Sequence, residues 1–314
     1  MFLRLAPFLT ELWGPFRLLG SYLVLIGFGA SAAALTVWLC LPRFWDRFPR
    51  DRGKMSAVEG VKAAGKPTGT GLLVVLLTVP WLVLVMPWSG RSFEIIACLL
   101  LCALTGYLDD RSPHPWGEFR KGILDLVVAV LTSLALCQGH DMVLWFPFVK
   151  GEFTISPVTF VAVGTVVLWF TINAVNCSDG VDGLAGSLLL LSLFCMGGFL
   201  YVVVGHVEVA EYLLVPHKPS GASWAVLAFT FSGTLAGYLW HNAQPSSALM
   251  GDAGSRPFGL LLDVMVLASG NPFLVLVVAP VLLINGGAGL LKILILRMMR
   301  RIGVDIAPPG TGTG

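Results

Sequence analysis

The side chains best suited to chemistry in this sequence are carboxylates in three short polar segments. The longest segment runs from Asn173 to Gly183, reads Asn-Ala-Val-Asn-Cys-Ser-Asp-Gly-Val-Asp-Gly, and carries Asp179 and Asp182. Glycine follows each of these aspartates, and glycine permits tight turns and close approach of the backbone to a ligand. Such a loop suits a site for a nucleotide or a phosphate. The simpler alternative is a solvated connector between two helices.

Two further acidic segments favour the catalytic interpretation. Asp109 and Asp110 close one apolar run, and adjacent carboxylates repel each other unless a cation or a proton transfer compensates. Asp252 lies in Met-Gly-Asp-Ala-Gly-Ser just before another apolar run. Mg2+ prefers a few carboxylates together with waters and substrate phosphates, so Asp252 is a candidate ligand. The alternatives are a helix cap for Asp252 and a plain polar helix end for the aspartate pair.

Lysines are available to neutralise phosphates. Lys66 lies in the segment Gly-Lys-Pro-Thr-Gly-Thr-Gly at 65–71 and Lys62 just before it, where they could bind a diphosphate or simply mark a cytoplasmic loop. Lys121 opens another apolar run, where it could pair with Asp125 on one helix face or contact a phosphate.

The chain that carries these segments has the composition of a membrane protein. Of its 314 residues 56% are hydrophobic and 12% charged, with a mean hydropathy of +0.83, whereas a soluble domain has about 25% charged residues. We predict an all-α polytopic protein with about nine transmembrane helices, each near the length that a bilayer core of about 30 Å requires. The expected spans are 20–41, 71–88, 93–108, 122–138, 158–173, 184–205, 222–240, 257–269 and 273–296.

The distribution of basic residues predicts the orientation. Fifteen of the 20 Lys and Arg residues fall in 42–70, 109–121, 241–256 and the tail from Lys292. Loops rich in Lys and Arg remain in the cytoplasm, so we expect the amino terminus outside and the carboxyl terminus inside. All the acidic segments then share the cytoplasmic face.

We expect one membrane domain at 20–301, flanked by an interfacial segment at 1–19 and a disordered tail at 302–314. The cysteines and histidines show no metal-ligand spacing, and there is no P-loop, serine nucleophile elbow or basic-aromatic pattern for nucleic acid. The residues favour Mg2+-dependent phosphoryl chemistry on a charged cytosolic substrate, with a lipid reaching the site from the bilayer. A transporter would more naturally place its charges near the bilayer midplane.

Three segments resemble motifs of the polyprenyl-phosphate N-acetylhexosamine-1-phosphate transferase superfamily. Residues 173–185 are similar to Asn-Ala-Val-Asn-Leu-Thr-Asp-Gly-Leu-Asp-Gly-Leu-Ala, and 242–255 resemble Asn-Ala-x-Pro-Ala-x-x-Phe-Met-Gly-Asp-x-Gly-Ser. Residues 65–71 resemble Gly-Thr-Pro-Thr-Met-Gly-Gly more loosely. The Asn-Ala-x-Pro portion favours the phospho-N-acetylmuramoyl-pentapeptide transferase branch. The alternatives are a polyprenyl-phosphate GlcNAc-1-phosphate transferase and an inactive membrane scaffold or transporter.

The resemblance implies Mg2+-dependent transfer of phospho-MurNAc-pentapeptide from UDP-MurNAc-pentapeptide to undecaprenyl phosphate, which yields lipid I and UMP in peptidoglycan synthesis. It implies a site on the cytoplasmic face of the bacterial inner membrane, and it suggests a homodimer. The implied roles are metal binding for Asp252, catalysis at the lipid phosphate for Asp109 and Asp110, phosphate neutralisation for Lys62 and Lys121, contacts with nucleotide and diphosphate for Asn173, Asn176 and Asp179, contacts with uracil for Gly180, Val181 and Asp182, and further substrate contacts for Asn242 and Leu249.

Two departures accompany the resemblance. Leu249 stands where the family has an aromatic residue on which uracil can stack, so we expect a weaker contact there. The family pattern continues with a His-His-His loop and a tenth span, whereas this sequence stops at Gly314. We expect either a truncated chain or a branch that manages without these elements.

Overall fold

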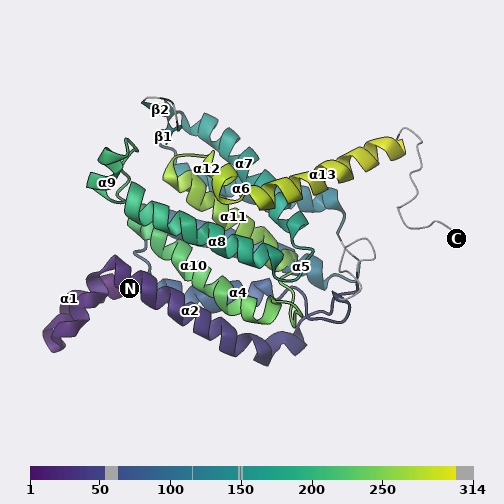
Figure 1. Cartoon of the computed structure of the whole chain (residues 1–314), viewed down its shortest axis with the longest axis horizontal. Coiled ribbons are helices and arrows are strands. Elements are labelled where there is room, and N and C mark those ends of the chain that lie inside the picture. Colours follow the sequence, from purple (N-terminus) through teal and green to yellow (C-terminus); the bar gives the residue numbers. More distant parts are fainter. Residues whose placement is uncertain (54–62, 115, 148, 150, 302–314) are drawn as a thin grey trace.

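A computed structural model describes residues 1–53, 63–114, 116–147, 149 and 151–301, most of them in helices of one bundle (Figure 1). The helical prediction is confirmed with one exception. Strands β1 (Met142–Trp145) and β2 (Glu152–Ile155) form an antiparallel hairpin that the sequence did not predict. Lys62 and the expected tail at 302–314 lie outside the described residues.

Each apolar run that was predicted to span the membrane carries a helix in the described part of the chain. Five helical stretches, which begin at Tyr22, Gly90, Pro157, Leu184 and Gly221, are long and apolar enough to cross a bilayer, as a multi-pass membrane protein requires. The number of nine spans and the outward amino terminus stay predictions. The long helices are α2 (Tyr22–Phe44), α4 (Gly71–Val85), α5 (Gly90–Arg111), α6 (Glu118–Cys137), α7 (Pro157–Ser178), α8 (Leu184–Gly198) continued by the π-helix η3 (Phe199–Val204), α10 (Gly221–Asn242), α11 (Asp252–Ser269) and α13 (Pro280–Arg301).

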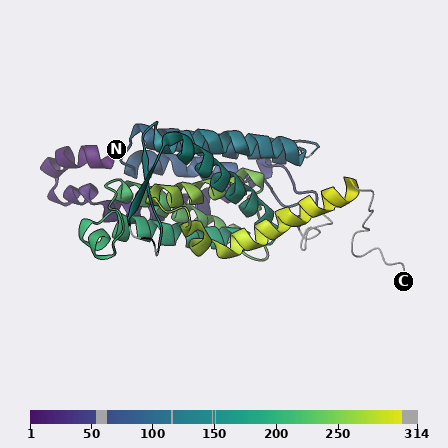
Figure 2. The same cartoon turned by 90° about the horizontal axis from the view of Figure 1, so that it is seen from above.

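Short elements connect these helices or lie at the ends of the bundle. The amino-terminal α1 leaves Phe8 and Leu12 exposed, as an interfacial helix would. Figure 2 shows α1 and the last turns of α13 extending beyond opposite ends of the bundle. The short elements are α1 (Phe2–Leu12), the 3-10 helices η1 (Gly14–Gly20) and η2 (Trp45–Arg47), α9 (Val207–Tyr212) and α12 (Leu274–Val278).

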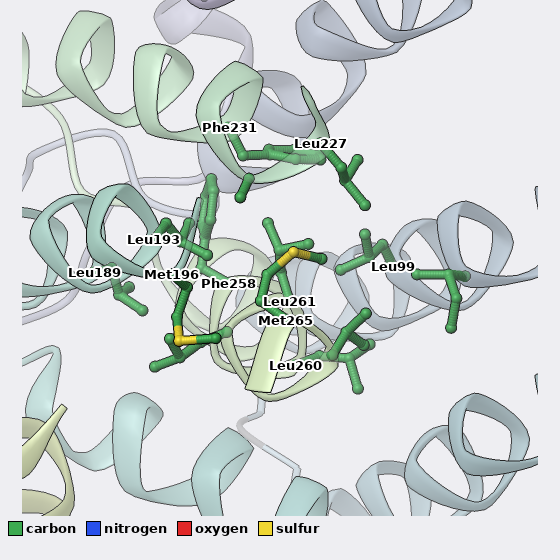
Figure 3. Packing of buried hydrophobic residues seen from close by; sticks show 14 of the residues in the cluster. Leu99, Leu189, Leu193, Met196, Leu227, Phe231, Phe258, Leu260, Leu261 and Met265 are labelled. Carbon is green, nitrogen blue, oxygen red and sulfur yellow. The ribbon is translucent and has the colours of Figure 1, made fainter. Parts of the chain in front are cut away.

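Helix α11 is the centre of the bundle, and every one of its residues is buried. A helix covered on all sides needs apolar side chains around its whole circumference, and α11 supplies them between Phe258 and Leu267. Figure 3 shows side chains of α11 packed among those of α5, α8 and α10; the labelled residues are Phe258, Leu260, Leu261 and Met265 of α11 with Leu99, Leu189, Leu193, Met196, Leu227 and Phe231.

Small residues allow several neighbouring helices to approach closely. A β-carbon at Gly233 or Gly237 of α10 would overlap the backbone of Ala30 or Ala34 of α2. Without a hydrophobic driving force between helices in lipid, such close packing is a main source of association.

The two ends of α11 mark the two ends of the bundle. At its carboxyl end, the Trp145 backbone N–H donates to Gly270 O at 3.0 Å, and its indole N–H donates to Ser269 O at 3.1 Å. The hairpin is thereby tied to that end. At the other end, which we call the site end, α5 finishes and α11 begins.

Candidate active site

The start of α11 is held by an aspartate from α5. Gly251 precedes the helix with φ +66°, and the carboxylate of Asp110 accepts hydrogen bonds from the backbone N–H groups of Asp252 at 3.2 Å and Ala253 at 3.0 Å. The free N–H groups of a helix start carry partial positive charge and favour an anion. Asp110 therefore caps α11 from a neighbouring helix and fixes the position of the Asp252 backbone.

Two glycines let other helices press directly against this start. A β-carbon at Gly106 of α5 would overlap the carbonyl of Asp252, and one at Gly71 of α4 would overlap Gly254. Both contacts are with backbone, which cannot rotate away as a long side chain can. The beginning of α11 is consequently wedged between α4 and α5.

Lys121 of α6 bridges two of the predicted catalytic aspartates. Its Nζ lies 2.8 Å from Oδ2 of Asp252 and forms a second ion pair with Oδ2 of Asp109. Asp109 is buried, and its other oxygen accepts a hydrogen bond of 2.7 Å from the Trp116 backbone N–H. Residues from α5, α6 and α11 thus meet in one charged cluster, which we call the acid cluster: Asp109, Asp110, Lys121 and Asp252.

Asp125 was one of two partners considered for Lys121, the other being a phosphate, and the ion pairs of Lys121 are with Asp109 and Asp252 instead. Asp125 pairs instead with Arg256 of α11, whose Nε and Nη2 both donate to Oδ1 of Asp125. The Asp125 side chain is 2% exposed and that of Arg256 is 0% exposed.

A second polar group forms at the loop that follows α7. Lys66 Nζ lies 3.1 Å from Oδ2 of Asp182 and 2.7 Å from Oγ of Ser246, and the Ser246 backbone N–H donates to the same Asp182 oxygen at 3.1 Å. Partial burial alone would raise the pKa of the Asp182 carboxyl, but the hydrogen bonds from Ser246 and Lys66 outweigh it and hold the pKa below its usual value. Asp182 therefore remains a carboxylate.

The segment from Pro67 to Thr70 connects the two groups. The Leu249 backbone N–H donates to Pro67 O at 2.8 Å, and the Thr70 hydroxyl donates to Leu249 O at 2.8 Å. A β-carbon at Gly69 would lie 3.2 Å from Cβ of Asp110, so the segment also touches the acid cluster. The Leu249 side chain is thus presented by a backbone that is fixed on both sides.

The amide side chains take different positions. Asn176 accepts a hydrogen bond of 2.8 Å from the Ser255 hydroxyl, one turn beyond Asp252. Asn242 is buried, and both polar atoms of its side chain bond to backbone groups. Its Oδ1 accepts a hydrogen bond from the Gly183 N–H at 3.1 Å, and its Nδ2 donates to Ala248 O at 2.9 Å.

The remaining predicted contacts lie at the end of α7 and just beyond it. Asn173 donates to Trp169 O, one turn back on its own helix, at 2.8 Å. Asp179 ends α7, and Gly180 and Val181 are exposed beyond it.

The acid cluster has the donor chemistry that Mg2+ requires. Carboxylate oxygens are its preferred protein ligands, and the Lys121 ammonium already occupies a cation position between Asp109 and Asp252. Among the described residues no group of three His, Cys, Asp or Glu side chains is arranged to enclose an ion. These carboxylates would fit an ion that keeps waters and phosphates in its shell and takes few protein ligands.

The sequence is similar to that of known proteins. Residues 92–270, which include the acid cluster, match the family model for glycosyl transferase family 4. The chain belongs to this family. As a member of glycosyl transferase family 4, it is a phosphoglycosyl transferase.

Individual relatives agree with the family model. The chain is 47% identical over 298 residues to the phospho-N-acetylmuramoyl-pentapeptide-transferase of Treponema pallidum (strain Nichols), and the match covers 94% of this chain and 82% of the relative. It is 27% identical over 312 residues to the protein of that name from Aquifex aeolicus, with 95% and 86% covered. The resemblance drawn from the sequence motifs is confirmed.

Three residues of this glycosyl transferase family 4 member make contacts that the sequence did not predict: Ser246, Asp125 and Arg256. Ser246 was hidden because a serine in a polar loop has no distinctive spacing. Arg256 lies in a segment that the sequence predicts to be a cytoplasmic loop, and Asp125 is there only one of two possible partners of Lys121. The available signal was that Asp125 and Arg256 are single charges of opposite sign at the edges of apolar runs, where such groups pair with one another.

Proposed function

We propose that the chain transfers phospho-MurNAc-pentapeptide from UDP-MurNAc-pentapeptide to undecaprenyl phosphate, releasing UMP and forming lipid I. One observation supports this above all: Lys121 gathers Asp109 and Asp252 at the start of α11, where Asp110 is fixed beside them. The name of the 47% identical relative supplies the substrate. The high Lys and Arg content of the segments at the site end supports a cytoplasmic site in the bacterial inner membrane.

The acid cluster can position both phosphates and remove a proton. In the reaction an oxygen of undecaprenyl phosphate attacks the β-phosphorus of the nucleotide sugar, and UMP leaves. Phosphoryl transfer depends mainly on positioning and on neutralising charge. Mg2+, held by Asp252, would supply part of that neutralisation, and Lys121 would supply the rest.

The two adjacent aspartates are not equivalent as proton acceptors. Both oxygens of Asp110 are occupied by backbone N–H groups of α11. Asp109 uses one oxygen for the Trp116 N–H and the other for Lys121. Once Lys121 turns to a phosphate, Asp109 has an oxygen available for the lipid phosphate proton.

The loop beyond α7 supplies the nucleotide contacts in this proposal. Asp182, held by Lys66 and Ser246, faces uracil together with Gly180 and Val181. Asn176 lies nearer the acid cluster through Ser255 and lines the diphosphate.

The test is an assay of UMP release from UDP-MurNAc-pentapeptide with undecaprenyl phosphate and Mg2+, run beside UDP-GlcNAc. We expect turnover with the first substrate only. Faster UMP release from UDP-GlcNAc would assign the chain to the GlcNAc-1-phosphate transferases. No UMP release from either substrate would favour an inactive scaffold.

The metal role has its own variant. Asp252→Asn should keep the fold, measured by thermal unfolding, and should lose Mg2+-dependent turnover by about 100-fold or more. Unchanged turnover in Asp252→Asn would remove Asp252 from the metal site.

A further inference from the structure

Two ion pairs join α6 and α11, one helical turn apart. Lys121 and Asp125 are four residues apart on α6, and Asp252 and Arg256 are four residues apart on α11. Residues at this spacing lie on the same face of a helix. Lys121 pairs with Asp252, and Asp125 pairs with Arg256, so the two helix faces are joined by two successive ion pairs. We call Lys121–Asp252 the outer pair and Asp125–Arg256 the inner pair.

The inner pair, Asp125–Arg256, is so deeply buried that a contribution to stability alone does not explain it. Both of its side chains are at most 2% exposed, and the Arg256 Nη1 has no hydrogen-bond partner among the described residues. Taking two charges out of water costs so much that an apolar pair of similar volume is often equally stable or more so. In some proteins such a pair is retained because it specifies one geometry.

The order of signs distinguishes one register from its neighbours. Along α6 the charges are positive then negative, and along α11 they are negative then positive. Sliding one helix by a turn, about 5.4 Å, would place Asp125 opposite Asp252 or Lys121 opposite Arg256. Either arrangement brings like charges together in a medium of low dielectric constant, which is strongly unfavourable.

We propose that Asp125 and Arg256 are positioning residues that fix the register of α11 against α6 and thereby hold the Asp252 carboxylate against Lys121 and Asp109. The glycine contacts described above fix α11 against α4 and α5, and the Asp125–Arg256 pair supplies the constraint from α6. A misplacement of about 1 Å can lower an enzymatic rate about 100-fold, so such a constraint bears directly on turnover.

The test is the double variant Asp125→Leu/Arg256→Met, which removes both charges together and leaves no unpaired buried charge. The matched control is Thr78→Val/Thr234→Val, which removes a buried polar pair between α4 and α10 whose hydroxyl oxygens are 2.8 Å apart. We expect both variants to keep the thermal unfolding midpoint of the wild type in the absence of Mg2+. The kcat for UMP release should fall about 10- to 100-fold in the first variant with little change in KM, and should be unchanged in the control.

A second readout does not depend on turnover. The Mg2+ concentration that gives half of the metal-induced rise in unfolding midpoint should increase about tenfold in the first variant, because Asp252 is less well placed. The kcat readout rests on the proposed function, whereas the Mg2+ readout does not, so a wild type that releases no UMP would defeat the proposed function alone. The positioning role is overturned if the double variant keeps both the wild-type kcat and the wild-type Mg2+ response. It is also overturned if the unfolding midpoint of the double variant falls below that of the wild type in the absence of Mg2+.

Discussion

Gly106 of α5 lies against the backbone carbonyl of Asp252, with no space for a β-carbon between them. Gly106→Ala must therefore push α11 away from α5 and carry Asp252 with it. We expect this variant to lose UMP release almost completely and to lose about 1–3 kcal/mol of stability, as overpacked sites do. UMP release and thermal unfolding measure the two effects.

Gly27 of α2 provides the matched control, because a β-carbon there would meet nothing within 4 Å. Gly27→Ala should keep full turnover and gain up to about 1 kcal/mol of stability from its higher helix propensity. Normal turnover in Gly106→Ala would show that the contact does not position Asp252.

Removing the ammonium from the acid cluster should expose the repulsion that it screens. Lys121→Met leaves Asp109 and Asp252 facing each other without a cation. In the presence of a metal chelator this should lower the free energy of unfolding by about 2 kcal/mol or more. Added Mg2+ should restore the unfolding midpoint more than it raises that of the wild type, because the ion can take the place of the ammonium. Lys121→Arg keeps the charge and serves as the control. Equal Mg2+ responses in Lys121→Met and in the wild type would argue against an ion between these carboxylates.

The residue at 249 should control affinity for the nucleotide. Because the backbone of Leu249 is fixed by Pro67 and Thr70, Leu249→Phe can add a ring without moving the loop. Stacking of a base on an aromatic ring contributes about 1–3 kcal/mol, so we expect the KM for UDP-MurNAc-pentapeptide to fall about fivefold or more with kcat unchanged. Leu249→Ala should not show this gain. A KM that is the same in all three proteins would place uracil elsewhere.

The pH dependence of stability should report on Lys218, which precedes α10 at the end opposite the acid cluster. Burial and the nearby charge of Arg91 lower the pKa of Lys218 from 10.5 to about 8, against the opposing effect of Glu152. The unfolded chain therefore binds more protons than the folded protein between about pH 8 and 10.5, and stability rises with pH through that window. Below about pH 8 the partly buried charge of Lys218 is a constant cost to stability.

Lys218→Met should raise the unfolding midpoint at about pH 7. It should also remove the part of the increase in stability between about pH 8 and 10.5 that Lys218 causes. Unfolding midpoints measured across this range test both points. Lys292→Met, on the exposed surface of α13, should leave the rise in place. A rise that persists unchanged in Lys218→Met would assign it to another group.

The sequence predicted the helices and the convergence of the acids for the same physical reason. Long apolar runs must be helical in a bilayer, and the order of the runs puts Asp109 and Asp252 at the same end of the bundle. The partner of Lys121 could not be predicted in this way. On α6 alone Asp125 is the obvious neighbour, and only the packing of α6 against α11 brings Arg256 to Asp125 and leaves Lys121 to pair with Asp252.

Close backbone contacts that depend on glycine having no side chain could not be predicted from the sequence either. Gly106 and Gly71 look like ordinary helix glycines in the sequence, and their importance lies in what stands opposite them in the folded chain. The hairpin at β1 and β2 was missed because its strands are only four residues each, too short for a clear alternation of apolar and polar residues.

The lysine between Asp109 and Asp252 has a consequence for how the protein meets its substrates. A bare group of three carboxylates would repel the nucleotide sugar and the lipid phosphate of the proposed reaction, because both carry negative charge. Lys121 among them offsets part of that repulsion before either proposed substrate arrives, and its ammonium could then turn from carboxylate to phosphate. In the proposed reaction, binding of each anion would then exchange one partner of the ammonium for another, which would let two anions approach the same small group of side chains.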